Sequence, residues 1–321
     1  LAPLLLFFTD DVWLIIAVWT LCVLPVMSLS PILDAATVRM TRRRGSDFAM
    51  IRVWGTLGYV AVNLVAGWLL GWAGIALFLP LYVIFCLVRG GMAFQLPAFR
   101  AKAPEDDKLK AEAKDSPAPH KLQAQAFKDM FRPWFTLAIL GSALIVASHG
   151  PLYTFGSLLW DQQGIGKETI GPLWAIGAGA EVIVFLVFAR IARRFSARHL
   201  LLFAAAVTCV RWIGMCFDMP TYGYFLLQML HAISFGVTYL GTLNFVANWT
   251  AESFAAEAQS TVQVLAQALL ATLVFGSGFI FSQFGALAFG ISAGVALAGG
   301  LCVFASLMLL NPRSEEQRPE V

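Results

Sequence analysis

The sequence contains few charged residues. Asp, Glu, Lys and Arg make up 13% of its 321 residues, whereas about a quarter is usual in a soluble globular domain. Hydrophobic residues account for 59% and occur in long runs. Such runs are typical of helices that cross a membrane, so the composition predicts an all-α, polytopic membrane protein. A net charge of +3 is too small to indicate a nucleic-acid-binding protein.

Motifs for metal binding and catalysis are also missing. The five cysteines lie in or beside apolar segments and form no CxxC pattern and no Cys/His cluster, so neither a disulfide framework nor a metal site is indicated. The chain contains no GxSxG, GxxxxGKS/T or HExxH pattern and no pair of carboxylates placed for acid–base catalysis. We therefore expect no enzyme, no metal and no cofactor.

Nine apolar segments are long enough, at about 20 residues, to cross a bilayer. Residues 1–8 resemble the end of a further span, and the chain begins without Met or a signal peptide, so we expect that an N-terminal part is missing. The nine predicted spans are residues 12–33, 50–71, 75–97, 134–159, 169–189, 199–217, 221–247, 258–282 and 286–310.

Lys and Arg are distributed unequally between the loops. Eighteen of them fall in one set of alternate loops (residues 39–44, 100–132, 190–198 and 313–318), and only Lys167 falls in the other set. Because cytoplasmic loops carry the excess of basic residues, this distribution predicts a cytoplasmic C-terminus.

One long, charged segment divides the chain. Residues 99–133 are rich in Lys, Glu, Asp, Ala and Pro, as is typical of a solvated linker. Three spans precede it and six follow it, an arrangement found in transporters built from two helical bundles. The predicted parts are therefore the remainder of an N-terminal bundle (1–98), a cytoplasmic linker (99–133), a C-terminal six-helix bundle (134–311) and a cytoplasmic tail (312–321).

Two charged residues of opposite sign lie within neighbouring spans. Glu181 is halfway along its span, and Arg211 lies in the next one, beyond the basic hairpin of residues 190–198. Ionisable residues are costly in a membrane and often functional. The pair is either a static ion pair that fixes helix packing or a carboxylate whose proton affinity depends on the nearby cation, which would couple protonation to conformation.

Other polar residues form stripes on the spans. Such stripes face the bundle interior or a water-filled cavity, where they either form hydrogen bonds between helices or contact a ligand. Either histidine can titrate near neutral pH or be a packing residue. The candidates are His149 and Tyr153 on one span, Gln228 and His231 on another, and Gln263 and Gln267 on a third.

Two further charged residues lie at span ends. Asp34 closes the first span, where it either pairs with Arg39 or Arg42 at the interface or faces a cavity. Arg52 begins the second span, and the simplest interpretation is an interfacial arginine whose side chain extends to the membrane surface.

Several of these segments resemble a known family. LWAIGAGAEVIVF, RIARRFSARHLLL and VRWIGM, which contain Glu181 and Arg211, resemble the eighth and ninth helices of major facilitator transporters of the 3-phenylpropionate permease type. The segments ILDAATVRM…DFAMIRVWGTLGYV, ASHGPLYTFGSLLW and LLQMLHAISFGVTYLG resemble that family's fourth-to-fifth, seventh and tenth helices. Related nucleoside–proton symporters share the Glu-then-Arg pattern.

The resemblance implies a twelve-helix, two-bundle carrier in the bacterial inner membrane, of which this chain covers helices four to twelve. It implies a monomer that works by alternating access with proton symport. Asp34, His149, Tyr153, Gln228 and His231 would be cavity residues. We therefore predict proton-coupled uptake of a small aromatic carboxylate such as 3-phenylpropionate by a protein in the lipid bilayer. Glu181 would carry the proton, with Arg211 and Asp34 as further coupling residues. Arg211 or a histidine would supply the cation for the substrate. A nucleoside or sugar symporter, or a non-transporting membrane sensor, is the alternative.

Overall fold

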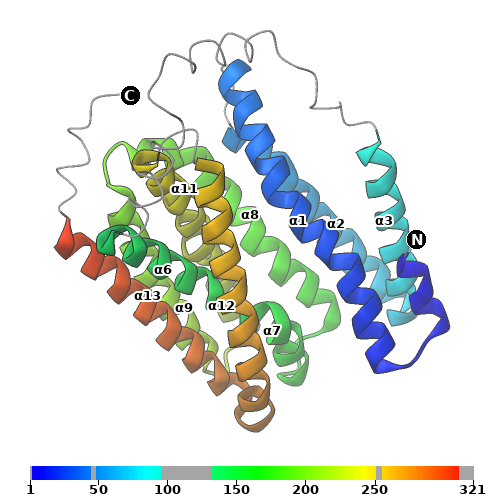
Figure 1. Cartoon of the computed structure of the whole chain (residues 1–321). Coiled ribbons are helices and arrows are strands. Elements are labelled where there is room, and N and C mark those ends of the chain that lie inside the picture. The colour runs from blue at the N-terminus through cyan, green and yellow to red at the C-terminus, as the bar shows by residue number, and fades with distance from the viewer. Residues whose placement is uncertain (1, 45–47, 95–131, 251–254, 311–321) are drawn as a thin grey trace. The chain divides into compact units, whose positions relative to one another are not determined.

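The computed structural model describes residues 2–44, 48–94, 132–250 and 255–310. Within these ranges every regular element is a helix (Figure 1), so the predicted all-α class is confirmed. The predicted linker and tail lie almost wholly outside the described residues, and the predicted boundaries of the two bundles stay predictions.

Six helical stretches of the described residues are long and apolar enough to cross a membrane. One of them, Ala258–Leu309, is 52 residues long and contains two successive helices. Two shorter apolar helices, Val12–Val26 and Phe78–Ala93, precede the linker. Each of the nine predicted spans thus overlaps with one or more of the helices.

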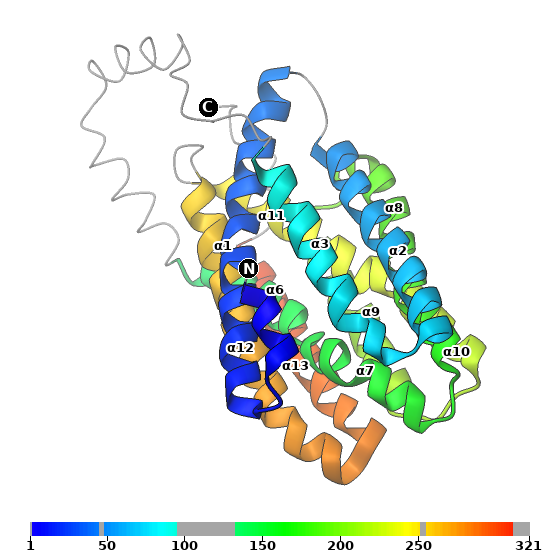
Figure 2. The same ribbon diagram turned by 90° about the vertical axis from the view of Figure 1, so that its right-hand side faces the viewer.

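The smaller of two compact units comprises residues 1–48 and 65–124. Its main helix, α1 (Val12–Arg44), packs against the short 3-10 helix η1 (Ala2–Phe8), which also contacts α3 (Phe78–Ala93) (Figure 2). Stacking of Trp19 on Tyr82, with ring centroids 5.1 Å apart, links α1 to α3. Asp34 lies on α1, but its side chain is outside the described part of the structure.

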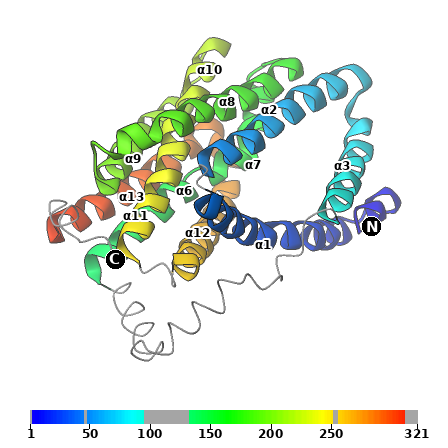
Figure 3. The ribbon, with the colours of Figure 1, turned by 90° about the horizontal axis from the view of Figure 1, so that it is seen from above.

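The larger unit comprises residues 49–64 and 125–321, and therefore includes the first part of α2 (Phe48–Ala73). Helix α13 packs against α6 and α9, α6 also packs against α12, and α8 packs against α10 and η3 (Figures 1 and 3). Its remaining elements are α6 (Pro133–Ala147), α7 (Gly150–Gln162), α8 (Lys167–Ala192), α9 (Ala197–Met215), α10 (Thr221–Met229), η3 (Ala232–Val237), α11 (Thr238–Trp249), α12 (Ala255–Phe284), η5 (Gly285–Ala288) and α13 (Phe289–Leu309).

Two of the spans are interrupted in the middle. The span Pro133–Gln162 breaks between α6 and α7, because Pro151 has no N–H to donate and its ring collides with the carbonyl four residues earlier. The span Thr221–Trp249 contains the π-helical segment η3, a local widening that often occurs at functional sites.

Glycine allows α6 and α13 to approach each other closely. A Cβ atom added at Gly299 would lie 2.7 Å from the carbonyl oxygen of Gly141, and one added at Gly141 would lie 2.6 Å from the carbonyl oxygen of Gly299. Both atoms belong to helix backbone and cannot rotate away, so the two helices pack through their glycines as small-residue interfaces in membranes do.

We expect Gly299→Ala to lower the free energy of unfolding by about 1–3 kcal/mol, because the added methyl group forces α6 and α13 apart. Thermal unfolding followed by circular dichroism in detergent would measure the change. Gly294→Ala is the matched control on the same helix, since no atom lies within 4 Å of a Cβ added there. Equal melting temperatures for the two variants would contradict the prediction.

Candidate functional site

The main cavity of the larger unit has a volume of about 390 Å³. Helices α2, α7, α8, α9 and α10 and the segment η3 contribute to it. Its lining combines aromatic rings, small residues and three charged side chains: Arg52, Gly55, Thr56, Tyr59, Tyr153, Trp174, Gly177, Ala178, Glu181, Arg211, Gln228, His231 and Phe235.

Arg211 is fully buried and makes four hydrogen bonds to neutral groups. Its Nε donates to the Leu227 carbonyl at 2.9 Å, and its Nη2 donates to Gln228 Oε1 at 2.6 Å. Its Nη1 donates to His231 Nδ1 at 3.1 Å and to Ser234 Oγ at 3.0 Å. A buried charge is tolerated only when it is well hydrogen-bonded, and these four acceptors meet that requirement.

The local backbone supplies part of this environment. Leu227 lies in the last turn of α10, where carbonyls lack partners in the helix and carry partial negative charge, which favours a nearby cation. The orientation of the Gln228 side-chain amide is fixed, because its Nε2 donates to the Leu173 carbonyl at 3.2 Å and a flipped amide would lose this bond. At Gly177 of α8 an added Cβ would lie 3.2 Å from the Gln228 carbonyl oxygen, so the glycine lets α8 and α10 approach closely.

His231 lies between Arg211 and Glu181. A guanidinium has no acceptor, so the contact at 3.1 Å requires a lone pair on His231 Nδ1. His231 is therefore neutral with its hydrogen on Nε2, which donates to Glu181 Oε1 at 2.8 Å. The Glu181 side chain is 10% exposed and lines the cavity, whereas Arg211 is enclosed by protein.

Among the described residues, no ion pair joins Glu181 directly to Arg211. The sequence indicated two opposite charges on neighbouring spans, either in a static pair or in a coupled one. The structure instead connects them through the neutral imidazole of His231. Protonation of Glu181 therefore removes no hydrogen-bond acceptor from Arg211.

A second branch of the network leads away from the cavity. Ser234 Oγ, which accepts from Arg211, lies 3.1 Å from His149 Nε2. His149 is fully buried, and its Nδ1 lies 3.0 Å from the Ile145 carbonyl oxygen in α6. Its ring meets that of Trp212 edge to face at 4.9 Å. His149 is therefore close to the site but does not line the cavity.

Arg52 and several rings form the remaining wall. The Arg52 guanidinium lies 5.5 Å from the centroid of the Tyr239 ring, within the range of a cation–π contact. Phe235 stacks on His231 at 5.2 Å and on Tyr239 at 6.2 Å. The Arg52 side chain is half-buried and lines the cavity, and its expected position at the membrane interface stays a prediction.

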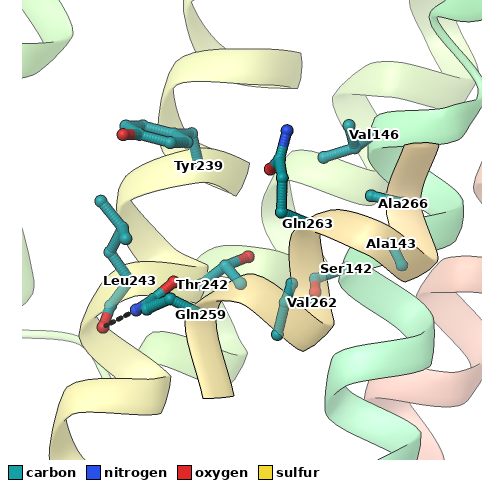
Figure 4. Close-up of a pocket in the computed structure, with 10 residues that line it drawn as sticks. All are labelled: Ser142, Ala143, Val146, Tyr239, Thr242, Leu243, Gln259, Val262, Gln263 and Ala266. Atoms are coloured by element: carbon teal, nitrogen blue, oxygen red, sulfur yellow. Dashed lines mark hydrogen bonds between the residues drawn. The ribbon is translucent and has the colours of Figure 1, made fainter. Parts of the chain in front are cut away.

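A second, smaller cavity of about 40 Å³ lies between α6, α11 and α12 (Figure 4). Gln263 and Tyr239 project toward it, and Gln259 donates to the Leu243 carbonyl at 3.5 Å. The other polar residues on its wall are the hydroxyls Ser142 and Thr242. Its volume is about a tenth of that of the main cavity, and the expectation that Gln263 contacts a ligand stays a prediction.

The structure brings together most of the predicted site residues. Glu181, Arg211, Tyr153, Gln228 and His231 line the main cavity, and His149 lies directly behind it. Gln263 lines the second cavity, and Gln267 is exposed and lines neither. The sequence analysis missed Ser234, Tyr59, Trp174 and Phe235. Ser234 could have been found by its spacing, because it follows His231 by three residues, as His231 follows Gln228.

The described residues contain no group of three or more His, Cys, Asp or Glu side chains arranged to hold a metal ion. The chemistry of the main cavity is therefore that of charge, hydrogen bonds and aromatic faces. An all-helical chain with membrane spans and a cavity of this size has the architecture of a membrane transporter.

Comparison with known proteins gives the family. Residues 1–292 match the model of the MFS_1-like family, so the chain belongs to this family of major facilitator transporters and is a multi-pass membrane protein. It is 26% identical over 272 residues to the probable 3-phenylpropionic acid transporter of Escherichia coli (strain K12), covering 84% of this chain and 68% of that protein. It is 24% identical over 247 residues to the maltose permease of Geobacillus stearothermophilus, covering 75% of this chain and 57% of that protein.

The family assignment bears on the sequence analysis in two ways. The expected major facilitator transporter is confirmed, and so is the expectation that the protein is not an enzyme. The two relatives differ in the substrate that their names give, at nearly equal identity, so the substrate has to be argued from the cavity.

We expect Arg211→Lys to destabilise the protein, because a compact ammonium group cannot reach four acceptors that the planar guanidinium bridges. Each buried acceptor left without a donor costs about 1–3 kcal/mol, so a marked fall in melting temperature should follow. Arg190→Lys, on the exposed end of α8, is the control and should melt like the unaltered protein. A melting temperature for Arg211→Lys within error of this control would contradict the assigned network.

Proposed function

We propose that the protein is a proton-coupled importer of a small aromatic monocarboxylate such as 3-phenylpropionate. The observation that carries the proposal is the charge of the main cavity. Arg52 and Arg211 bring two positive charges to its wall and ionised Glu181 brings one negative charge, while His231 is neutral. Counted over these three side chains alone, the wall has one more positive than negative charge, which a monocarboxylate would balance and an uncharged sugar would not.

The placement of the two arginines assigns them different roles. Arg211 is fully buried and its hydrogen bonds go to protein groups, so it supplies charge but little direct contact. Arg52 is half-buried and borders the cavity, so we assign the substrate carboxylate to its guanidinium, which favours planar carboxylates. Tyr59, Tyr153 and Trp174 border the same space and would pack against an aromatic ring.

Glu181 is the group that we assign to the proton. Protonation removes the negative charge that opposes an anion in the same cavity, so the proton and the anion each favour binding of the other. Linkage makes this effect reciprocal. His231 would keep a hydrogen-bonding partner for Glu181 in both protonation states, because the carboxyl group retains an acceptor oxygen when it is protonated.

A sugar or nucleoside symporter is the alternative. It is supported by the similarity to the maltose permease and by the amide of Gln228 at the cavity wall. The proposed importer also includes three further points. It lies in the bacterial inner membrane, works as a monomer and has a cytoplasmic C-terminus, which the loop charges predict. A non-transporting sensor is disfavoured by membership in a transporter family.

Uptake into vesicles would test the substrate. With the full-length protein reconstituted and an inward proton gradient imposed, we expect radiolabelled 3-phenylpropionate to accumulate, whereas maltose and uridine should not. The uncharged amide of 3-phenylpropionate should compete poorly, because it lacks the negative charge that balances the cavity. Accumulation of maltose or uridine in place of the acid would overturn the proposed substrate.

Arg52→Gln serves as the matched variant in the same assay. Loss of a charge-assisted hydrogen bond of about 1.5–3 kcal/mol should raise the KM for the acid by a factor of about ten or more. Arg89→Gln, on the exposed side of α3, should leave the KM unchanged.

We expect Glu181→Gln to abolish accumulation against a gradient while sparing substrate exchange. The glutamine side chain can still accept the hydrogen bond from His231 Nε2 but cannot bind a proton at physiological pH, so the cavity should remain intact without its coupling group. Glu168→Gln, at the exposed start of α8, is the control. Unchanged accumulation by Glu181→Gln would remove Glu181 from the coupling role.

A further inference from the structure

We propose that His149 and Ser234 are positioning residues that hold Arg211, and through it His231, in the orientation that presents a hydrogen-bond donor to Glu181. The proposal deepens the proposed function, on which its meaning for transport rests. Neither residue lines the main cavity, so both would act on Glu181 from behind its wall.

The donor and acceptor roles follow from the partners. The Ile145 carbonyl, 3.0 Å from His149 Nδ1, can only accept. Nδ1 therefore carries the hydrogen of a neutral His149, and Nε2 has a lone pair. Ser234 Oγ lies 3.1 Å from Nε2 and 3.5 Å from the His231 carbonyl oxygen, and we assign its hydroxyl hydrogen to the nearer acceptor, Nε2. The lone pairs of Ser234 are then directed to the N–H of Arg211 at 3.0 Å.

Arg211 transmits this orientation to His231. Nη1 has two hydrogens, and its two acceptors are Ser234 Oγ and His231 Nδ1. The guanidinium is planar, so the bond to Ser234 restricts its rotation and thereby directs the other hydrogen to His231. Removing Ser234 would leave one Nη1 hydrogen without its acceptor while the bonds from Nε and Nη2 remain, so the guanidinium would be free to shift at Nη1 and its hydrogen bond to His231, the residue that donates to Glu181, would weaken.

The arrangement requires that His149 be neutral. A proton on its Nε2 would point at the Ser234 oxygen that already accepts from Arg211, and two cations would then share one hydroxyl. The titratable groups around His149 are Arg211 from α9, His231 at the start of η3 and Tyr153 from α7, whose ring centroid is 6.1 Å away. Glu181 from α8 lies beyond His231.

Infrared titration of the reconstituted protein would test the proposal. The carbonyl band of protonated Glu181, assigned by its loss in Glu181→Gln, reports the protonation of that carboxyl group as a function of pH. We expect Ser234→Ala and His149→Leu each to move the titration midpoint by about half a pH unit or more, the equivalent of one lost hydrogen bond.

The double variant distinguishes a relay from two separate effects. If His149 acts through Ser234, the shift in His149→Leu/Ser234→Ala should equal that of Ser234→Ala alone, since residues in one network are not additive. A shift equal to the sum of the single shifts would overturn the proposal. His149→Gln should restore the normal midpoint, because its amide oxygen can accept from Ser234 without becoming charged; a midpoint shifted as far as in His149→Leu would also overturn it.

The matched control is Ser292→Ala. Ser292 is fully buried in α13, and its hydroxyl has no hydrogen-bond partner in the described part of the structure. This variant should leave the Glu181 midpoint unchanged, and melting temperatures would verify that each variant is folded. If His149→Leu does not fold, the Glu181 titration midpoints of Ser234→Ala and His149→Gln still test the positioning role.

The failures of the two proposals are distinguishable. An unchanged midpoint in folded Ser234→Ala would overturn the positioning role alone, because the infrared band reports Glu181 whether or not it drives transport. Accumulation that persists in Glu181→Gln would overturn the proposed function alone.

Discussion

The burial of one guanidinium determines the structure around the main cavity. Arg211 carries a permanent charge, and none of its four hydrogen bonds goes to its own helix. The end of α10 and the start of η3 must therefore approach α9 closely enough to supply a backbone carbonyl, an amide, an imidazole and a hydroxyl. Displacing any of these elements would expose a cation to an apolar environment, which is among the most costly changes possible in a membrane protein.

The same constraint gives the hydrogen bonds a direction. Because Arg211 can only donate, His231 must accept on one side and donate on the other, and the carboxylate of Glu181 receives the last hydrogen bond. The permanent charge is thus enclosed by protein while the charge that can change lies at the cavity edge. A carboxylate in direct contact with Arg211 would be held ionised by it, whereas the intervening imidazole leaves room for a proton.

Much of the fold and some of the site could be predicted from the sequence. Long apolar runs and loop charges specify the spans, and Glu181 and Arg211 are conspicuous because charge is rare inside such runs. That His231 lies between them could not be inferred, since it depends on how α8, α9 and α10 pack. The same holds for Ser234 and His149, which are 85 residues apart in the sequence and meet only because Pro151 interrupts one span and η3 interrupts another.

One polar stripe contributes to both cavities. At a uniform 100° per residue, Gln228, His231, Tyr239 and Thr242 share one face. The second pair lies about 16 Å further along the helix axis, and the first two residues line the main cavity while the last two line the smaller one.

Several residues of the cavity wall come from other elements than the acceptors of Arg211. Arg52, Tyr59, Tyr153 and Trp174 lie on α2, α7 and α8, whereas the four acceptors lie on α10 and at η3, and two of these acceptors, Gln228 and His231, also line the cavity. Changes on α2, α7 and α8 alter the shape and charge of the cavity without removing an acceptor from Arg211. A change among the acceptors leaves a buried donor without a partner. The proposed carrier could therefore vary its substrate through α2, α7 and α8 while the network that links Arg211 to Glu181 stays the same.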